Sequence, residues 1–282
     1  MADYSGSIIE SQVDWLTVSA HGETRASRLL DLAHSLEPQQ RAAGNRSRAW
    51  RLMGYEGFHC GALEYGSRGR DHATVRLIGD LAERELVKAL SVADLVTRLD
   101  LAVTWRAEPP DPLLGANAYS MAEMWHASHP KGAMPSRVTD AAGGYTVYLG
   151  RRTSDAMLRL YNKGQETMAK GDLAEQERYR DCWRYELECK GGVAPRLAET
   201  VNLADDRALY VQSYVYEWTR KHGIEPAFPR EGAVKLVPGF RRRSDSDSKL
   251  RHLAKNVRPS IEWLRADGKL DLARKALGLE EG

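Results

Sequence analysis

Residues 95–105 read LVTRLDLAVTW, and apolar and polar side chains alternate along them with the period of a β-strand. One face of this strand is apolar and carries Leu99, Leu101 and Val103. The other face carries Arg98 and Asp100. The stretch therefore predicts a strand that packs on a hydrophobic core with one face and presents charged groups on the other.

Two later segments repeat this pattern and place further charged groups on one face. WRYELECK (183–190) puts Arg184, Glu186, Glu188 and Lys190 on its polar face, and LRLYNKG (158–164) puts Arg159, Tyr161 and Lys163 on one face. Carboxylates suit a hard cation such as Mg²⁺ or Mn²⁺, basic groups suit phosphate oxygens, and a tyrosine can serve as a nucleophile. The alternative is a solvated face of an antiparallel sheet that carries cross-strand ion pairs.

The order of elements predicts an α+β fold with a central antiparallel sheet, helices packed on one face and a helical C-terminal third. Strands are expected near 8–18, 60–66, 73–79, 144–150, 156–164 and 183–191, and helices near 24–38, 81–91, 117–129, 203–223 and 260–268. Short glycine-containing connections favour antiparallel pairing. QVDWLTVSA (12–20) and TRLDLAVTW (97–105) each place one Asp in an apolar strand, as a duplicated half-sheet would. We expect a sheet domain over 1–200, intertwined with a helical region over 201–282.

Composition excludes several classes of protein. The 282 residues carry a net charge of +2, and no run approaches the roughly 18 apolar residues of a membrane helix. The start of the chain has no secretory pattern, and three cysteines are too few for a disulfide framework. We expect a soluble cytoplasmic protein with reduced thiols and no membrane partner.

One segment is strongly basic. Residues 235–258 hold eight Lys and Arg against two acidic residues. Such a surplus can attract a phosphate backbone, and the candidate phosphate-binding residues in it are Arg241, Arg242, Arg243, Lys249 and Arg251. The alternative is a solvated basic loop.

Five segments together resemble the replication initiation factor family. They are VDWLTV (13–18), TRLDLAV (97–103), YTVYLGRRTSDAMLRLYNKGQE (145–166), WRYELECK (183–190) and VRPSIEWLRADG (257–268). The family contains rolling-circle initiators of plasmids and filamentous phages, and relaxases of integrative conjugative elements. The resemblance implies metal-dependent nicking and religation of one DNA strand, an antiparallel sheet flanked by helices, and a homodimer that works with a host helicase and polymerase.

The resemblance also implies residue roles. The family tyrosine maps onto Tyr161, which would form a 5′-phosphotyrosine, with Lys163, Glu166 and Arg184 as further catalytic residues. A divalent metal would be held by Asp100 and Glu186, with Glu188 as a third ligand, and the DNA strand by Arg98, Arg159 and Lys190. Many family members have Asp where this chain has Thr104, so the metal ligands here would be fewer or come from elsewhere. There are two alternatives. One is a relaxase, and the other is a DNA-binding regulator that has the same fold but no nicking activity.

Overall fold

The computed structural model describes residues 6–36, 39–41, 48–53, 59–65, 72–139, 144–170, 173–232, 234–237, 258–269 and 271. The chain divides into two compact units, Met1–Pro238 and Gly239–Gly282. In the second unit, α9 (Arg258–Ala266) forms where SIEWLRADG predicts a short helix. Residue 200, where the sequence analysis divides the chain, lies within helix α6 (Val193–Asn202) of the first unit.

Within the described residues, ten strands form one sheet, and every neighbouring pair is antiparallel. The strands are β1 (Gly6–His21), β2 (Gln39–Arg41), β3 (Arg48–Met53), β4 (His59–Tyr65), β5 (His72–Ile78), β6 (Leu95–Ala107), β7 (Pro135–Thr139), β8 (Tyr145–Leu149), β9 (Ala156–Asn162) and β10 (Cys182–Lys190). Their order is β2-β3-β4-β5-β1-β6-β10-β9-β8-β7. The predicted central antiparallel sheet is thus confirmed.

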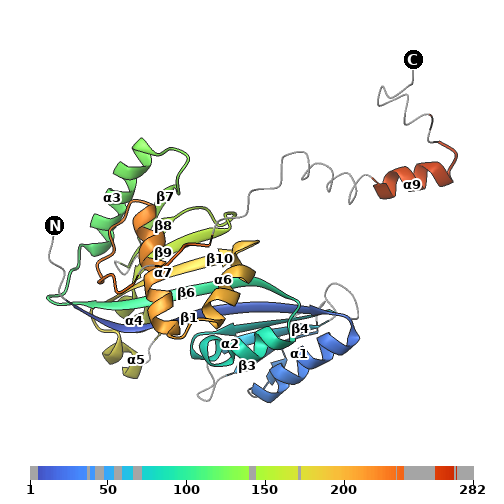
Figure 1. Ribbon diagram of the computed structural model, residues 1–282, viewed down its shortest axis with the longest axis horizontal. Helices are drawn as coiled ribbons and strands as arrows, with labels where there is room; N and C mark the ends of the chain where they lie inside the picture. Colours follow the sequence, from blue (N-terminus) through green and yellow to red (C-terminus); the bar gives the residue numbers. More distant parts are fainter. Residues whose placement is uncertain are drawn as a thin grey trace. The chain divides into compact units, whose positions relative to one another are not determined.

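The helices of the first unit lie mainly on one face of this sheet (Figure 1). They are α1 (Glu23–Leu36), α2 (Asp80–Val92), α3 (Leu114–Ser128), α6 (Val193–Asn202) and α7 (Arg207–Lys221). Two short helices, α4 (Lys163–Lys170) and α5 (Leu173–Arg178), connect β9 to β10. Tyr179, directly after α5, reaches Glu10 on the face opposite the long helices, so this connection borders that face. Within the described residues, no long helix covers that second face.

The topology contains the same arrangement twice. Each half begins with a long strand and a helix, continues through four further antiparallel strands, and ends with a helix: β1-α1-β2-β3-β4-β5-α2 and β6-α3-β7-β8-β9-α4-α5-β10-α6. The second half differs in having α4 and α5 between its last two strands. In each half the last strand pairs with the first, β5 with β1 and β10 with β6. The two halves join through β1 and β6. This order agrees with the duplicated half-sheet suggested by the Asp-containing echo.

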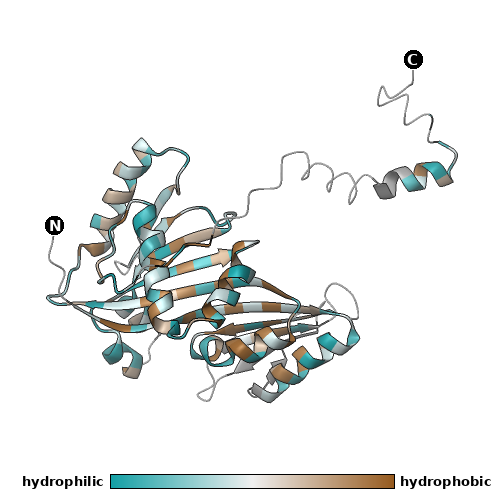
Figure 2. Cartoon of the chain, viewed as in Figure 1, coloured by the Kyte–Doolittle hydropathy of each residue, from teal (hydrophilic) through white to brown (hydrophobic). Residues whose placement is uncertain are grey.

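The core lies between the sheet and the long helices. Leu99, Leu101 and Val103 of β6 are fully buried, as their alternation predicts, and α7 adds Val211, Tyr214 and Val215 from above β1 and β6. In Figure 2 the strands alternate between hydrophobic and hydrophilic residues along their length. Alternation on central strands therefore sends the charged side chains to the face without long helices.

Several local features differ from the sequence-based expectation. Near the start of α2, Glu83 makes no capping hydrogen bond, because its carboxylate accepts the Val13 N–H at 2.7 Å and pairs with Arg207. Helix α7 begins after Asp206, whose carboxylate accepts the Leu209 N–H, so it starts later than the expected residue 203. The strands β2, β3 and β7 and the helix α6 were not expected, because their patterns are short or lie in polar surroundings.

Two findings bear on the expected surroundings of the protein. Among the described helices, none combines the length and the apolar character needed to cross a membrane. Cys182 and Cys189 are both buried in β10 and carry free thiols. Burial raises the pKa of the Cys189 thiol well above its ordinary value, which keeps it protonated.

The core assignment predicts a large difference between two leucines of β6. Leu101→Ala should lower the free energy of unfolding by about 2–5 kcal/mol, because it empties a fully buried position. Leu95→Ala, on the same strand but with a side chain 45% exposed, should change it by less than about 1 kcal/mol. Urea denaturation of both variants checks this, and equal losses would contradict the assignment of the core face.

Candidate functional site

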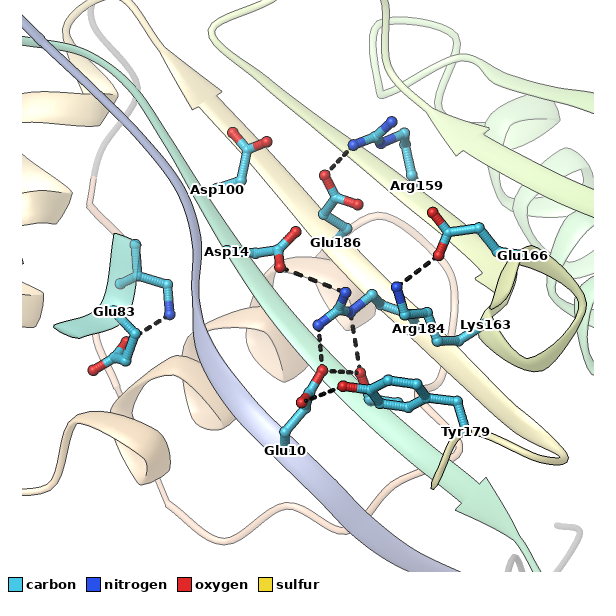
Figure 3. Close-up of polar contacts among 12 residues, drawn as sticks. Glu10, Asp14, Glu83, Asp100, Arg159, Lys163, Glu166, Tyr179, Arg184 and Glu186 are labelled. Carbon is cyan, nitrogen blue, oxygen red and sulfur yellow. Dashed lines mark hydrogen bonds and ion pairs between the residues drawn. The ribbon is translucent and has the colours of Figure 1, made fainter. Parts of the chain in front are cut away.

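The polar face of β6, β10 and β9 is organised by the pairing of these strands. Thr104, Arg184 and Tyr161 form one cross-strand row, and the next rows are Ala102–Glu186–Arg159 and Asp100–Glu188–Met157. Side chains in one row lie on the same face about 5 Å apart. The sheet thus brings together the predicted residues Asp100, Arg159, Tyr161, Arg184, Glu186 and Glu188, as Figure 3 shows for the labelled members of this set.

Arg184 lies at the centre of a buried polar cluster and is only 4% exposed. Its guanidinium pairs with Glu10 and with Asp14 at 3.5 Å, and its Nε donates to Thr104 Oγ1 at 3.0 Å (Figure 3). Burial opposes its charge, but these carboxylates and the neighbouring Tyr161 raise the pKa of Arg184 above its ordinary value. The guanidinium is therefore a fixed positive charge beside the tyrosine.

Glu10 receives hydrogen bonds from several elements at once. Thr104 Oγ1 donates to its Oε1 at 3.1 Å, and Tyr179 Oη and Arg178 Nη2 donate to its Oε2 at 2.8 and 2.9 Å. Glu10 and Thr104 are register partners on β1 and β6. A carboxylate from β1 therefore lies against the Thr104 side chain of β6.

Tyr161 is half-buried in the middle of this face. Its hydroxyl donates to Glu186 Oε2 across 3.4 Å, a long hydrogen bond. Burial, and then the negative charge of Glu186, raises the pKa of Tyr161 well above its ordinary value, while Arg184 opposes this rise. The phenol is therefore protonated at neutral pH, and Glu186 is the carboxylate that accepts its hydrogen bond.

Lys163 does not continue the strand, because β9 ends at Asn162 and α4 begins at Lys163. The side chain nevertheless stays near the cluster. Its Nζ is 2.6 Å from Glu166 Oε2 and 5.3 Å from the centre of the Tyr179 ring. Lys163 is only 6% exposed, so its charge is held beside the polar face and not in solvent.

The three predicted metal ligands lie on one face but are each bonded to a basic group. Arg98 binds Asp100 at 2.5–3.1 Å and Glu188 at 2.9 Å, and Lys190 pairs with Glu188. Arg159 pairs with Glu186. Among the described residues, no group of three or more His, Cys, Asp or Glu side chains is arranged to hold a metal ion. The carboxylates as arranged here therefore do not fit a divalent cation.

The pKa of Asp100 is set by several opposing interactions. The side chain is fully buried, and this burial raises the pKa of Asp100 to about 8. Hydrogen bonds from Arg98 oppose the rise, and the charges of Glu186 and Glu188 add to it. The Arg98 guanidinium also lies 4.2 Å from the centre of the Trp15 ring, which holds it over this carboxylate.

Sequence reasoning missed three members of the cluster: Glu10, Asp14 and Tyr179. Glu10 and Asp14 lie within the predicted first strand, but pairing irregularities between Ile8 and Glu10 and between Val13 and Trp15 break its alternation. A period of two therefore could not assign both carboxylates to one face. Tyr179 follows α5, and nothing in its local sequence indicates which strand it contacts.

The predicted DNA-contacting residues fall into two groups. Arg98, Arg159 and Lys190 lie on the polar face, where each is paired with a carboxylate. The other five, Arg241, Arg242, Arg243, Lys249 and Arg251, lie outside the described residues.

The buried cluster predicts that Glu10→Gln destabilises the fold. Removing this charge leaves the buried Arg184 guanidinium with Asp14 as its remaining carboxylate, and we expect a loss of about 3 kcal/mol in the free energy of unfolding. Glu177→Gln is the matched control, because its pair with Arg180 is exposed and should contribute less than about 1 kcal/mol. Thermal and urea denaturation check both values, and a neutral Glu10→Gln would contradict the role of this charge.

The pairing of the carboxylates predicts weak metal binding by the protein without DNA. Mn²⁺ should bind poorly because its ligands are neutralised, and Arg159→Ala should strengthen binding by releasing Glu186. Arg137→Ala is the control, because Arg137 lies 5.0 Å over the Tyr119 ring of α3 instead. Titration followed by electron paramagnetic resonance measures free Mn²⁺. Tight binding by the unaltered protein that Glu186→Gln abolishes would contradict this interpretation.

Part of the chain is similar to proteins that have been described before. No curated protein matches the chain by sequence. One matching solved structure is described as that of a rolling circle replication initiator protein from Geobacillus stearothermophilus. It shares 14% identity over 84% of this chain and 90% of that chain, with a TM-score of 0.47. The model of the replication initiation factor family matches residues 95–222, the segment that holds β6, β9 and β10. Over residues 95–222, a little less than half of the chain, the sequence is therefore similar to the replication initiation factor family.

Proposed function

We propose that this protein initiates rolling-circle DNA replication by nicking and religating one DNA strand at a specific origin, with Tyr161 as the nucleophile. The observation that carries the proposal is the position of Tyr161 on the polar face, between the guanidinium of Arg184 and the carboxylate of Glu186. A phosphodiester bound there would meet a nucleophile, a proton acceptor and fixed positive charges. The family match over residues 95–222 supports replication initiation as the process served.

The reaction is a transesterification. Tyr161 Oη attacks the phosphorus, its proton passes to Glu186, and the bond between phosphorus and the 3′ oxygen breaks. The products are a 5′-phosphotyrosine and, once the leaving oxygen has taken up a proton, a free 3′-hydroxyl. Because one phosphodiester replaces another, the 3′-hydroxyl can reverse the step and rejoin the strand.

The basic residues of the face have distinct roles in this scheme. Arg184 is held by Glu10, Asp14 and Thr104, so its charge stays beside the attacking oxygen and offsets the charge that develops on the phosphoryl group. Lys163 lies at the end of β9, where its ammonium can protonate or stabilise the leaving oxygen, and Glu166 orients it. Arg98, Arg159 and Lys190 would exchange carboxylate partners for phosphates of the strand.

The phenol of Tyr161 is protonated in the protein without DNA, so it must lose its proton to a base during the attack. The expected divalent cation, Mg²⁺ or Mn²⁺, stays a prediction, since its ligands are engaged by Arg98, Arg159 and Lys190. We therefore assign no step to a metal. Origin DNA is the proposed partner, with the nick site presented as a single strand or hairpin, and a homodimer and host helicase and polymerase remain proposals.

Tyr161→Phe tests the nucleophile. The change removes only the phenolic oxygen, so folding and DNA binding should persist while nicking of a supercoiled plasmid with the cognate origin falls below detection. Tyr148→Phe is the matched control, because this tyrosine lies on the neighbouring strand β8 and should retain nicking. A Tyr161→Phe protein that still forms a detergent-resistant adduct with DNA would exclude Tyr161.

The same assay separates the alternatives. A DNA-binding regulator would bind the origin without nicking it, whereas an initiator and a relaxase would both nick. The grouping of a tyrosine, a carboxylate and buried basic groups favours an active enzyme over a regulator. A relaxase would instead cut at a transfer origin, and plasmids carrying each kind of origin distinguish the two.

The basic segment predicts a division of labour between duplex binding and cleavage. Changing Arg241, Arg242 and Arg243 together to Ala should weaken duplex binding and lower its salt slope by about 0.9 for each phosphate that is no longer neutralised. Cleavage of a short single-stranded oligonucleotide should be nearly unchanged, because Tyr161 is untouched. Filter binding across a salt series measures the slope. Failure to cleave the oligonucleotide with duplex binding unchanged would place these arginines at the scissile strand.

A further inference from the structure

A cavity lies on the same sheet face as Tyr161, toward the edge formed by β7. Its volume is about 400 Å³, and its apolar lining includes Met134, Val138, Tyr148 and Met157. Met134 and Val138 are 49% and 55% exposed, whereas Met157 is 3% exposed and lies at the base of the cavity. The apolar groups therefore face an accessible hollow.

Strand pairing fixes the position of this cavity relative to Tyr161. Tyr148 of β8 pairs with Arg159, and Thr146 pairs with Tyr161, so Tyr148 lies one strand over and two residues along from Tyr161. With the spacings of a β-sheet, the two Cα atoms are about 8 Å apart. One extended DNA strand that passes over Tyr161 can therefore also reach the cavity.

The charge at the cavity is positive. Arg151 and Arg152 line it from the turn after β8, and both are exposed. Within the described part of the chain, neither forms an ion pair with a carboxylate, whereas Arg98, Arg159 and Arg184 on the same face all do. These two guanidiniums can therefore bind phosphates without first releasing a carboxylate.

We propose that this cavity binds an unpaired nucleobase of the strand that Tyr161 cuts, with the base stacked on the ring of Tyr148. Met134 would contact the edge of the base, and Arg151 and Arg152 the adjacent phosphates. This combination of an aromatic platform and a basic rim is typical of sites for single-stranded nucleic acid, and it does not require a particular base. The inference rests on the proposed function, because that function supplies the strand.

The experiment measures the binding of a single-stranded oligonucleotide that carries 2-aminopurine and a terminal fluorescein. Tyr161→Phe protein is used throughout, so that no cleavage occurs. Tyr148→Ala should weaken binding on the order of tenfold and abolish the quenching of 2-aminopurine, because the stacking surface is gone. Tyr148→Phe should bind as tightly as the parent, because the ring remains. Tyr119→Ala is the control on the helix-covered face and should keep both signals.

The arginines supply a second measurement that does not depend on Tyr148. Arg151→Ala and Arg152→Ala should each lower the salt slope of single-strand binding by about 0.7, the value for one phosphate neutralised on a single strand. Thermal melting verifies that each variant is folded. Unchanged affinity, quenching and salt slope in the folded variants would overturn the inference.

The outcome can be separated from that of the proposed function. If the protein with Tyr161 intact forms no DNA adduct but Tyr148→Ala still weakens single-strand binding, nicking fails and the base site stands. If the adduct forms and Tyr148→Ala binds as its parent does, the nucleophile stands and the base site is wrong.

Discussion

The burial of Arg184 on a central strand is the constraint on which the rest of the polar face depends. A guanidinium in that position is costly unless carboxylates and hydrogen-bond acceptors surround it, and Glu10, Asp14 and Thr104 do so from β1 and β6. The duplicated topology makes this possible, because the first strands of the two halves lie side by side and β10 pairs directly with β6. Arg184 of the second half is therefore bound by residues of β1 and β6, the two strands that join the halves.

The charged side chains on this face form ion pairs, and the phosphates of a bound DNA strand could replace the carboxylates in them. Asp100, Glu186 and Glu188 are each held by a basic side chain, and desolvation and the charge of Glu186 raise the pKa of Tyr161 further above neutral pH. A phosphate that took over Arg159 would free Glu186, and a free carboxylate is a better acceptor for the phenolic proton. In this account DNA binding frees the Glu186 carboxylate, and without DNA Glu186 stays paired with Arg159.

Much of this arrangement could be predicted from alternation alone. The period of two along residues 97–105 and 183–190 assigned the core and polar faces of β6 and β10, and with them Asp100, Arg184 and Glu186. The chemistry of these side chains suggested metal, phosphate and nucleophile roles, the family resemblance connected them with DNA nicking, and the roles of the individual residues stay predictions.

Other features could not be predicted, because they depend on irregular or distant contacts. The pairing irregularities in β1 hide Glu10 and Asp14 from any periodic pattern, and Tyr179 reaches Glu10 from a connection more than 160 residues later in the chain. The pairing of each predicted metal ligand with Arg or Lys is likewise a property of three neighbouring strands and not of any one segment.

The central claim is that Tyr161, and no other tyrosine on this face, becomes bonded to DNA. The most direct measurement is peptide mapping by mass spectrometry of the covalent adduct formed on an origin oligonucleotide, after digestion of both protein and DNA. The account predicts a nucleotide attached to the peptide that contains Tyr161. A nucleotide attached to Tyr148 or Tyr179 instead would contradict it.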